Sequence, residues 1–138
     1  MKLQYTTNCA LHMMVYLTGE KRIVSSRELE EKTRFPQQCI FNAGRKLKKA
    51  GYVNTVAGPF GGYTLGKPPQ EISIHAILAV FKDSFSLCCE QMPVINYPTT
   101  TLGNFLLWQT KLESDFVEKM SAINLADLVK ETDPSFTY

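Results

Sequence analysis

The stretch from Thr33 to Leu65 constrains the fold more than any other part of the chain. From Gln37 to Lys49 its apolar residues recur with helical spacing, and Gly51 is a suitable place for the helix to stop. Two short alternating segments joined by a glycine-rich run follow, at Tyr52–Val56, Tyr63–Leu65 and the connecting residues 58–62. This pattern is typical of a β-hairpin, so the sequence predicts a helix followed directly by a hairpin.

Charge is concentrated in the same part of the chain. Between Lys32 and Gln70 there are seven Lys or Arg and no Asp or Glu, whereas the remainder holds eight cations and thirteen acids. The net charge of +2 hides this division. A cationic segment of this kind suggests an anionic partner, and its helix and hairpin suggest duplex DNA.

The segments before this stretch predict two further helices. Apolar spacing predicts a helix over residues 3–18, with Gly19 just beyond its end. Ser25 and Glu28 form a capping-box pattern that begins a short helix ending near Lys32. We expect the remaining segments to be a connecting strand at Ile23-Val24, a turn at 33–35, and Pro36 at the first position of the next helix.

Beyond the hairpin, Pro68-Pro69 breaks the chain, Ser73 caps a predicted helix over 74–81, and residues 83–101 are expected to form a loop. A helix of about twenty residues follows, and a short amphipathic helix is expected over 123–129. The long helix has a broad apolar stripe that includes Leu102, Phe105, Leu106, Leu112 and Phe116. Such a stripe favours self-association into a homodimer, and the alternative is packing against its own domain.

Together these elements predict a mainly α fold with a small β-hairpin. We interpret residues 1–82 as a winged helix-turn-helix domain and residues 83–138 as a loop with a long C-terminal dimerisation helix. In that arrangement the helix at Gln37–Lys49 enters the major groove and the hairpin lies beside it.

The candidate DNA-binding residues lie on that helix, on the hairpin and at the N-terminus. The lysines suit phosphates, Arg45 suits guanine, Gln38 and Asn42 suit adenine, and Phe41 suits a thymine methyl. The alternative is that the polar side chains only solvate a helix face. The full set is Lys2, Gln37, Gln38, Phe41, Asn42, Arg45, Lys46, Lys48, Lys49, Gly58, Phe60, Gly61, Gly62 and Tyr63.

The glycine-rich run has a second interpretation, as a loop that cradles the phosphates of a nucleotide. Its context argues against this, because no Lys-Ser/Thr pair and no helix start follow it. Glycines at a hairpin tip instead permit positive φ and a close approach to a DNA backbone.

Other classes of protein find less support. No run approaches the roughly 20 apolar residues of a membrane span, and we find no signal-peptide pattern. The four cysteines do not form a disulfide framework, since Cys88 and Cys89 are adjacent, so we expect reduced thiols in the cytoplasm. The sequence contains no recognisable catalytic grouping, so we do not expect an enzyme.

Residues 46–74, KLKKAGYVNTVAGPFGGYTLGKPPQEISI, resemble the hallmark segment of the Rrf2 family of bacterial winged-helix transcription regulators. The opening helix, SSRELEE and the long late helix match in order, so the resemblance covers nearly the whole chain. It implies a homodimeric repressor with paired recognition helices and wings on a pseudo-palindromic operator. The family usually has Arg before the wing Gly-Pro, where this chain has Ala57, and residues at Phe41 and Gly44 also differ. These departures leave open a module that binds protein or a small ligand and has lost specific DNA binding.

Family members that bind an iron–sulfur cluster carry three spaced cysteines after the wing, where this chain has only Cys88 and Cys89. A conventional cluster site is therefore not expected. A metal held by both thiols and the partner subunit's His12 is one alternative, since thiolates and imidazole suit iron or zinc. A thiol-based sensor of a redox or small-molecule signal is favoured over it, and a plain structural role for all three residues is the remaining interpretation.

Overall fold

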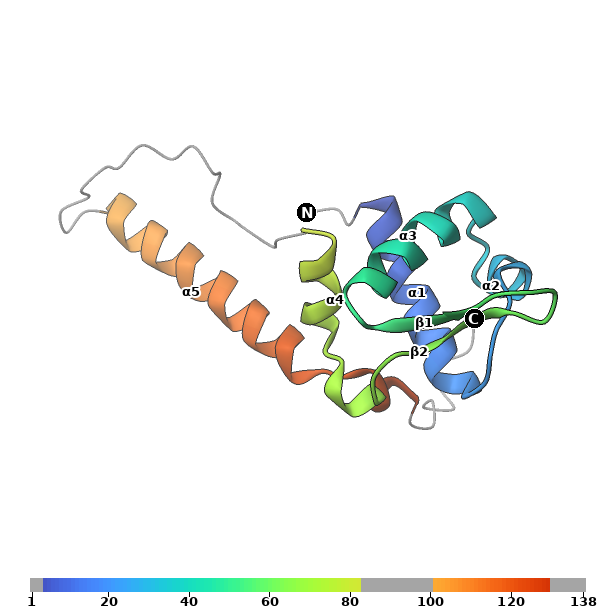
Figure 1. The fold of residues 1–138 in the computed structure, drawn as a ribbon. Coiled ribbons are helices and arrows are strands. Elements are labelled where there is room, and N and C mark those ends of the chain that lie inside the picture. Colours follow the sequence, from blue (N-terminus) through green and yellow to red (C-terminus); the bar gives the residue numbers. More distant parts are fainter. Residues whose placement is uncertain (1–3, 83–100, 130–138) are drawn as a thin grey trace, which may run out of the picture.

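The computed structural model describes residues 4–82 and 101–129, and it confirms a mainly helical fold with one small hairpin (Figure 1). Two strands, β1 and β2, pair antiparallel between the third and fourth helices. The elements in chain order are α1 (Tyr5–Glu20), α2 (Ser26–Thr33), α3 (Gln37–Lys49), β1 (Val53–Val56), β2 (Gly62–Leu65), η1 (Pro69–Glu71), α4 (Ile74–Val80), α5 (Thr101–Ala122) and η2 (Leu125–Val129).

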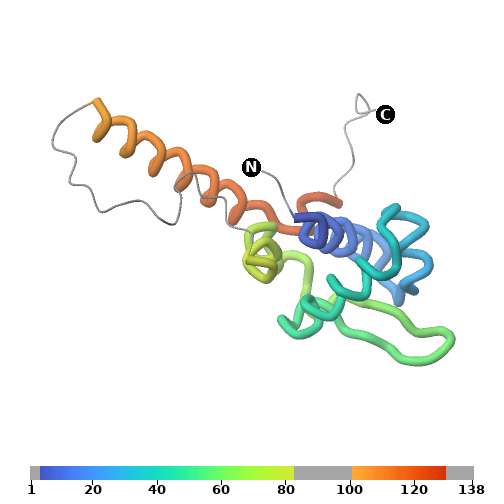
Figure 2. The backbone as a smooth tube through the Cα atoms, turned by 90° about the horizontal axis from the view of Figure 1, so that it is seen from above, coloured from blue at the N-terminus to red at the C-terminus, as the bar shows by residue number. Residues whose placement is uncertain are grey.

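Helix α1 is the centre of the core. It contacts α2, α3, α4, β2 and η2, and in Figure 2 it lies between α3 on one side and η2 on the other. The largest fully buried side chains come from every layer around it, namely Met13, Met14, Leu17, Leu29, Ile40, Leu47, Ile72, Ile77, Leu78 and Leu125. Burial of these apolar side chains positions α3 at the surface of the domain.

Several helix boundaries differ from the prediction. Gly19 lies inside α1, which continues to Glu20 and ends because Lys21 adopts a left-handed φ of 54° and donates its N–H to the carbonyl of Leu17. Pro36 is the N-cap of α3 and not its first helical residue. Tyr52 precedes β1, and the last predicted helix is a short 3-10 turn, η2.

The capping prediction at α2 is confirmed in one of its two bonds. The N–H of Glu28 donates to Ser25 Oγ at 3.1 Å. The Glu28 carboxylate, however, accepts hydrogen bonds from the Arg22 guanidinium and from the Tyr16 hydroxyl, both at 2.7 Å to Oε2. The side chain therefore joins the end of α1 to the start of α2 and does not return to the Ser25 backbone.

The hairpin is anchored to the domain by a third segment. Val53 pairs with Leu65 and Val56 with Gly62 across the two strands. On the other side of β2, Val24 and Tyr63 exchange both backbone hydrogen bonds, at 3.0 and 2.8 Å. The connecting strand predicted at Ile23-Val24 is thus one rung of pairing, and it fixes the base of the wing against the domain.

Helix α5 packs beside α4 and projects from the domain, with its C-terminal end next to the domain and its N-terminal end far from it (Figures 1 and 2). None of its residues, all of which lie in the described part of the chain, is buried. After α5 the chain returns to the domain, where Ile74 N–H bonds to Ile123, Leu125 N–H bonds to Ile72, and Leu125 is fully buried. The division of the chain at residues 82 and 83 stays a prediction.

Candidate nucleic-acid interface

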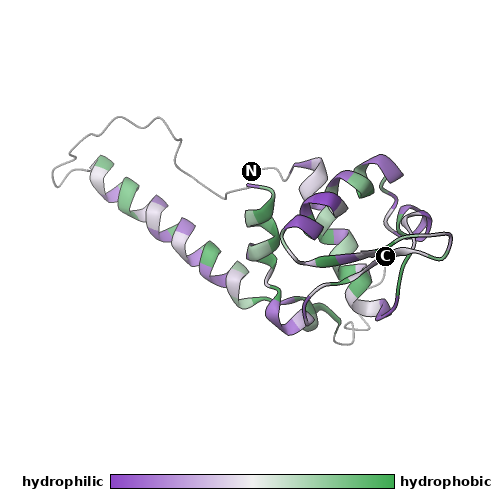
Figure 3. Cartoon of the chain, in the orientation of Figure 1, coloured by the Kyte–Doolittle hydropathy of each residue, from purple (hydrophilic) through white to green (hydrophobic). Residues whose placement is uncertain are grey.

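Helix α3 has one buried face and one exposed, cationic face. Ile40, Ala43 and Leu47 are fully buried against the domain, because apolar residues at 3–4 spacing share one side of a helix. Figure 3 shows the corresponding alternation of hydrophobic and hydrophilic bands along the helix. The domain therefore presents the opposite side of α3 to a partner.

Four exposed residues form a line along the outside of α3, which we call the recognition ridge. They are Gln38, Asn42, Arg45 and Lys49, spaced four, three and four residues apart, so they stack along the helix axis. The Gln38 amide donates to Asn42 Oδ1 at 3.3 Å. Amide and guanidinium groups in this order can make the two-point contacts that distinguish adenine and guanine in a major groove.

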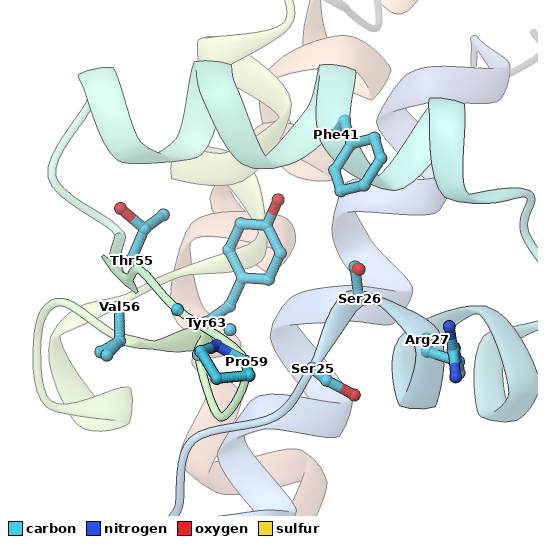
Figure 4. Close-up of a pocket in the computed structure, with 11 residues that line it drawn as sticks. Ser25, Ser26, Arg27, Phe41, Thr55, Val56, Pro59 and Tyr63 are labelled. Carbon is cyan, nitrogen blue, oxygen red and sulfur yellow. The ribbon is translucent and has the colours of Figure 1, made fainter.

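Phe41 and the hairpin enclose a groove on one side of the ridge (Figure 4). The groove has a volume of about 480 Å³ and is lined by α2, α3 and the wing. Phe41 is 41% exposed and points into it, opposite Ser26 and Pro59. The sequence pattern did not single out Ser26, Arg27 or Thr55, although all three line the groove; the cap at Ser25 was the signal that placed the start of α2 there.

The wing tip is strongly exposed, and two of its glycines have different structural roles. Phe60 is 92% exposed at the tip. Gly58 has a φ of 101°, as expected for a turn glycine. Gly62 allows a close approach, because a Cβ there would lie 2.1 Å from the carbonyl oxygen of Val24.

Tyr63 is placed differently from the other candidate contacts. It is only 9% exposed, and its ring lies beneath α3 beside Gly44. Burial raises the pKa of its phenol, and the charge of the Arg45 guanidinium opposes that shift. Tyr63 therefore supports the ridge and the groove from below, with little surface left for a partner.

Lys46 is also set apart from the ridge. Its ammonium group lies 5.4 Å from the centre of the Phe81 ring at the end of α4, a cation–π contact. Gln37 is partly buried and Lys48 is exposed on the wing side of α3, while Lys2 lies outside the described residues. That these residues bind DNA stays a prediction.

Of the three predicted sensor residues, the structure describes only His12. The His12 ring donates from Nδ1 to the Asn8 carbonyl at 2.7 Å and packs edge-on against Phe35. Cys88 and Cys89 lie outside the described residues. Within residues 4–82 and 101–129, no three His, Cys, Asp or Glu side chains are grouped closely enough to hold a metal ion.

The other two cysteines form a buried pair between α1 and α3. Cys9 and Cys39 are both free thiols in the core. Burial raises the pKa of the Cys9 thiol, and its hydrogen bond with Cys39 raises it further. The raised pKa keeps Cys9 as a neutral thiol, the form that reacts least readily, and both side chains are shielded by burial.

The predicted dimerisation residues occupy one side of α5. Leu102, Phe105, Leu112 and Phe116 are exposed, whereas Leu106 is partly covered. Trp108 extends this face, with its ring stacked on that of Phe105 at 5.8 Å. In the described part of the chain, no helix is both long and apolar enough to cross a membrane.

Comparison with known proteins places this geometry in a family. The sequence profile of Rrf2, described as "Iron-dependent Transcriptional regulator", matches residues 3–131. Protein aau3 of Rhizobium meliloti is 29% identical over 133 residues, which cover 94% of this chain and 86% of that protein.

Two solved structures share the fold. CymR, the global cysteine regulator of B. subtilis, superposes with a TM-score of 0.76 at 22% identity, over 96% of this chain and 99% of that one. IscR of T. potens superposes with a TM-score of 0.72 at 21% identity, over 100% of this chain and 93% of that one. Likeness at these identities establishes a common fold.

Proposed function

This chain belongs to the Rrf2 family and is a DNA-binding transcriptional regulator, and we propose that it acts as a homodimeric repressor on a pseudo-palindromic operator. In this proposal α3 enters the major groove and the wing lies beside it. Two copies related by a twofold axis would read two halves of one inverted repeat.

The observation that carries the proposal is the recognition ridge. Its four side chains, Gln38, Asn42, Arg45 and Lys49, are all exposed and are all of types that bind base edges or phosphates. Residues 33–70, which contain the ridge and the wing, include no Asp or Glu to repel a phosphate backbone. Lys48 at the wing side of α3 and Phe60 at the wing tip would extend the contact to the backbone and the neighbouring groove.

The exposed face of α5 supports the homodimer. A stripe that includes Phe105, Leu112 and Phe116 would remain in water in a monomer, which is unfavourable by about 25 cal/mol for each Å² of apolar surface. A second copy of α5 offers a matching surface, because a twofold interface joins the same patch on both subunits.

The proposed signal acts through Cys88 and Cys89, with a redox or small-molecule effector favoured over a bound metal. In the alternative, a metal would be held by both of these thiols and the partner subunit's His12. Anaerobic purification followed by an ultraviolet–visible spectrum and a metal assay tests this. A coloured, iron-containing protein would replace the thiol proposal with a cluster proposal.

Selection of bound DNA from a random duplex library tests the main proposal. We expect an inverted repeat whose half-sites are separated by about 10–10.5 base pairs or a multiple of this. On that site Arg45→Ala should cost about 1–3 kcal/mol and relax the preference at one base pair, whereas Lys49→Ala should weaken all sequences alike. Enrichment of no sequence, or an Arg45→Ala protein with unchanged affinity and preference, would contradict the proposed recognition face.

A further inference from the structure

A second cationic surface lies between the C-terminal ends of α3 and α4. It is a recess of about 470 Å³, separate from the groove at the wing. Its walls carry three lysines, Lys46, Lys49 and Lys82, around a floor formed by Ala50, Val80 and Phe81. None of these lining residues, all within the described part of the chain, is acidic.

The three lysines reach this recess from different positions in the fold. Lys46 is held over the ring of Phe81 at 5.4 Å. Lys49 is in the last turn of α3. Lys82 follows α4 in a left-handed conformation, with a φ of 56°, and its N–H donates to the Ala79 carbonyl at 3.2 Å.

Three like charges around one recess repel one another unless an anion lies among them. The C-terminal carbonyls of α3 and α4 attract cations and offset part of this repulsion, but none of the described residues that line the recess carries an acidic side chain. The recess therefore favours an anion that can contact two or three ammonium groups, and the apolar floor suits a group that carries carbon next to its charge.

Lys49 belongs to both the recognition ridge and the recess. An anion in the recess would consequently lie at the edge of whatever α3 binds. We infer that the recess receives a backbone phosphate of the bound duplex, with the deoxyribose against Val80 and Phe81. This inference rests on the proposed function and adds α4, through Lys82, to the DNA-binding surface.

The test compares two lysines in the same backbone conformation. Lys21 follows α1 with a φ of 54° and Lys82 follows α4 with a φ of 56°; both are exposed. Asn tolerates this conformation, so Lys82→Asn and Lys21→Asn remove one charge each with a similar effect on folding. Lys21 adjoins Glu20 and Arg22, which form an ion pair, and lies outside residues 33–70.

Affinity for the selected operator and for a random duplex is measured over a salt series. We expect the dependence of log K on log salt to be less steep by about 0.9 for Lys82→Asn, because one phosphate contact is lost. This corresponds to roughly an eightfold loss of affinity at 0.1 M salt. The loss should be equal on both duplexes, because a phosphate contact carries no sequence information. Lys21→Asn should leave the slope unchanged.

Failure of the inference and failure of the proposed function give different results. A wild-type protein that binds neither duplex would contradict the proposed function itself. Normal wild-type binding with equal slopes for Lys82→Asn and Lys21→Asn would overturn the phosphate contact alone. Equal slopes for the two variants, combined with inorganic pyrophosphate that stabilises the wild type against heat but does not stabilise Lys82→Asn, would also overturn the phosphate contact. That outcome would assign the recess to a free anion.

Discussion

The ring of Tyr63 lies directly against the backbone of Gly44, so closely that a Cβ at Gly44 would come within 2.6 Å of ring carbon Cε1. This contact joins β2 to the middle of α3. It explains a glycine inside a helix, where it costs roughly 1 kcal/mol relative to Ala. The ring of Tyr63 and the absence of a side chain at Gly44 thus set the separation between the wing and the recognition helix.

We predict that Gly44→Ala destabilises the protein despite its better helix propensity. Moving the Tyr63 ring to accommodate a methyl group should cost about 1–3 kcal/mol, as overpacking of a core usually does. Chemical denaturation monitored by circular dichroism measures the free energy of unfolding.

Gly19→Ala is the matched control for this substitution. Gly19 is also inside a helix, but a Cβ there would meet no atom within 4 Å. This variant should gain about 0.4–1 kcal/mol. Similar free energies for the two variants would show that the contact with Tyr63 does not determine the residue at position 44.

The hydrogen bond between Tyr16 and Glu28 predicts a change at alkaline pH. The Glu28 carboxylate raises the pKa of Tyr16 from its usual 10 to about 12, chiefly by accepting a hydrogen bond from the Tyr16 hydroxyl. Because the pKa is raised in the folded state, the bond stabilises the protein below pH 10 and its contribution disappears as the pH rises through about 12. Glu28→Gln should return the Tyr16 pKa toward 10 in an absorbance titration, with Tyr16→Phe identifying the signal.

The same carboxylate predicts a change at acid pH. Hydrogen bonds from Arg22 and then from Tyr16 lower the pKa of Glu28 below its usual 4.5. Its contribution to stability is therefore present above pH 4.5 and disappears as the pH falls through the lowered pKa. The difference in melting temperature between wild type and Glu28→Gln should be largest near neutral pH and vanish in strong acid; a constant difference would contradict this.

Trp108 offers a direct test of the proposed dimer. It is the only tryptophan of the chain and is 57% exposed on the outer face of α5. Burial against a second copy should shift its fluorescence to shorter wavelength as protein concentration rises. Leu112→Glu should remove both the shift and the dimer seen by sedimentation, since a buried unpaired charge costs several kcal/mol.

Leu107→Glu is the control for that experiment. Leu107 is 69% exposed, but it precedes Leu112 by five residues and so lies about 140° around the helix. This variant should remain a dimer. Loss of the dimer in both variants would mean that a different face of α5, or the whole helix, makes the contact.

The thiols should separate into two classes of reactivity. Both core thiols are buried, and burial also raises the pKa of Cys9, so neither should react with a colorimetric thiol reagent in the native protein. In a Cys88→Ser/Cys89→Ser variant, we therefore expect reaction only after denaturant is added. Rapid reaction of that variant in native buffer would show that the core opens, and would remove the assignment of sensing to Cys88 and Cys89.

Local patterns in the sequence predicted the elements well and predicted some contacts poorly. The Ser25 cap was correct because it depends on residues three apart. The stop predicted at Gly19 was wrong, because α1 ends where Lys21 adopts a left-handed φ and donates its N–H to the carbonyl of Leu17. The position of Lys46 could not be predicted either, since its partner Phe81 lies 35 residues away in the sequence and only packing brings α4 beside α3.

The exposed stripe of α5 makes the stability of this helix depend on protein concentration. None of the 22 residues of α5 is buried, so packing against its own domain contributes little to the stability of this helix. A partner that covers the exposed stripe would therefore also stabilise the helix. If a second copy of the chain covers the stripe, dilution destabilises the helix and a higher protein concentration stabilises it. The amount of protein made by the cell then determines what fraction is dimeric and able to bind the operator, independently of any chemical signal.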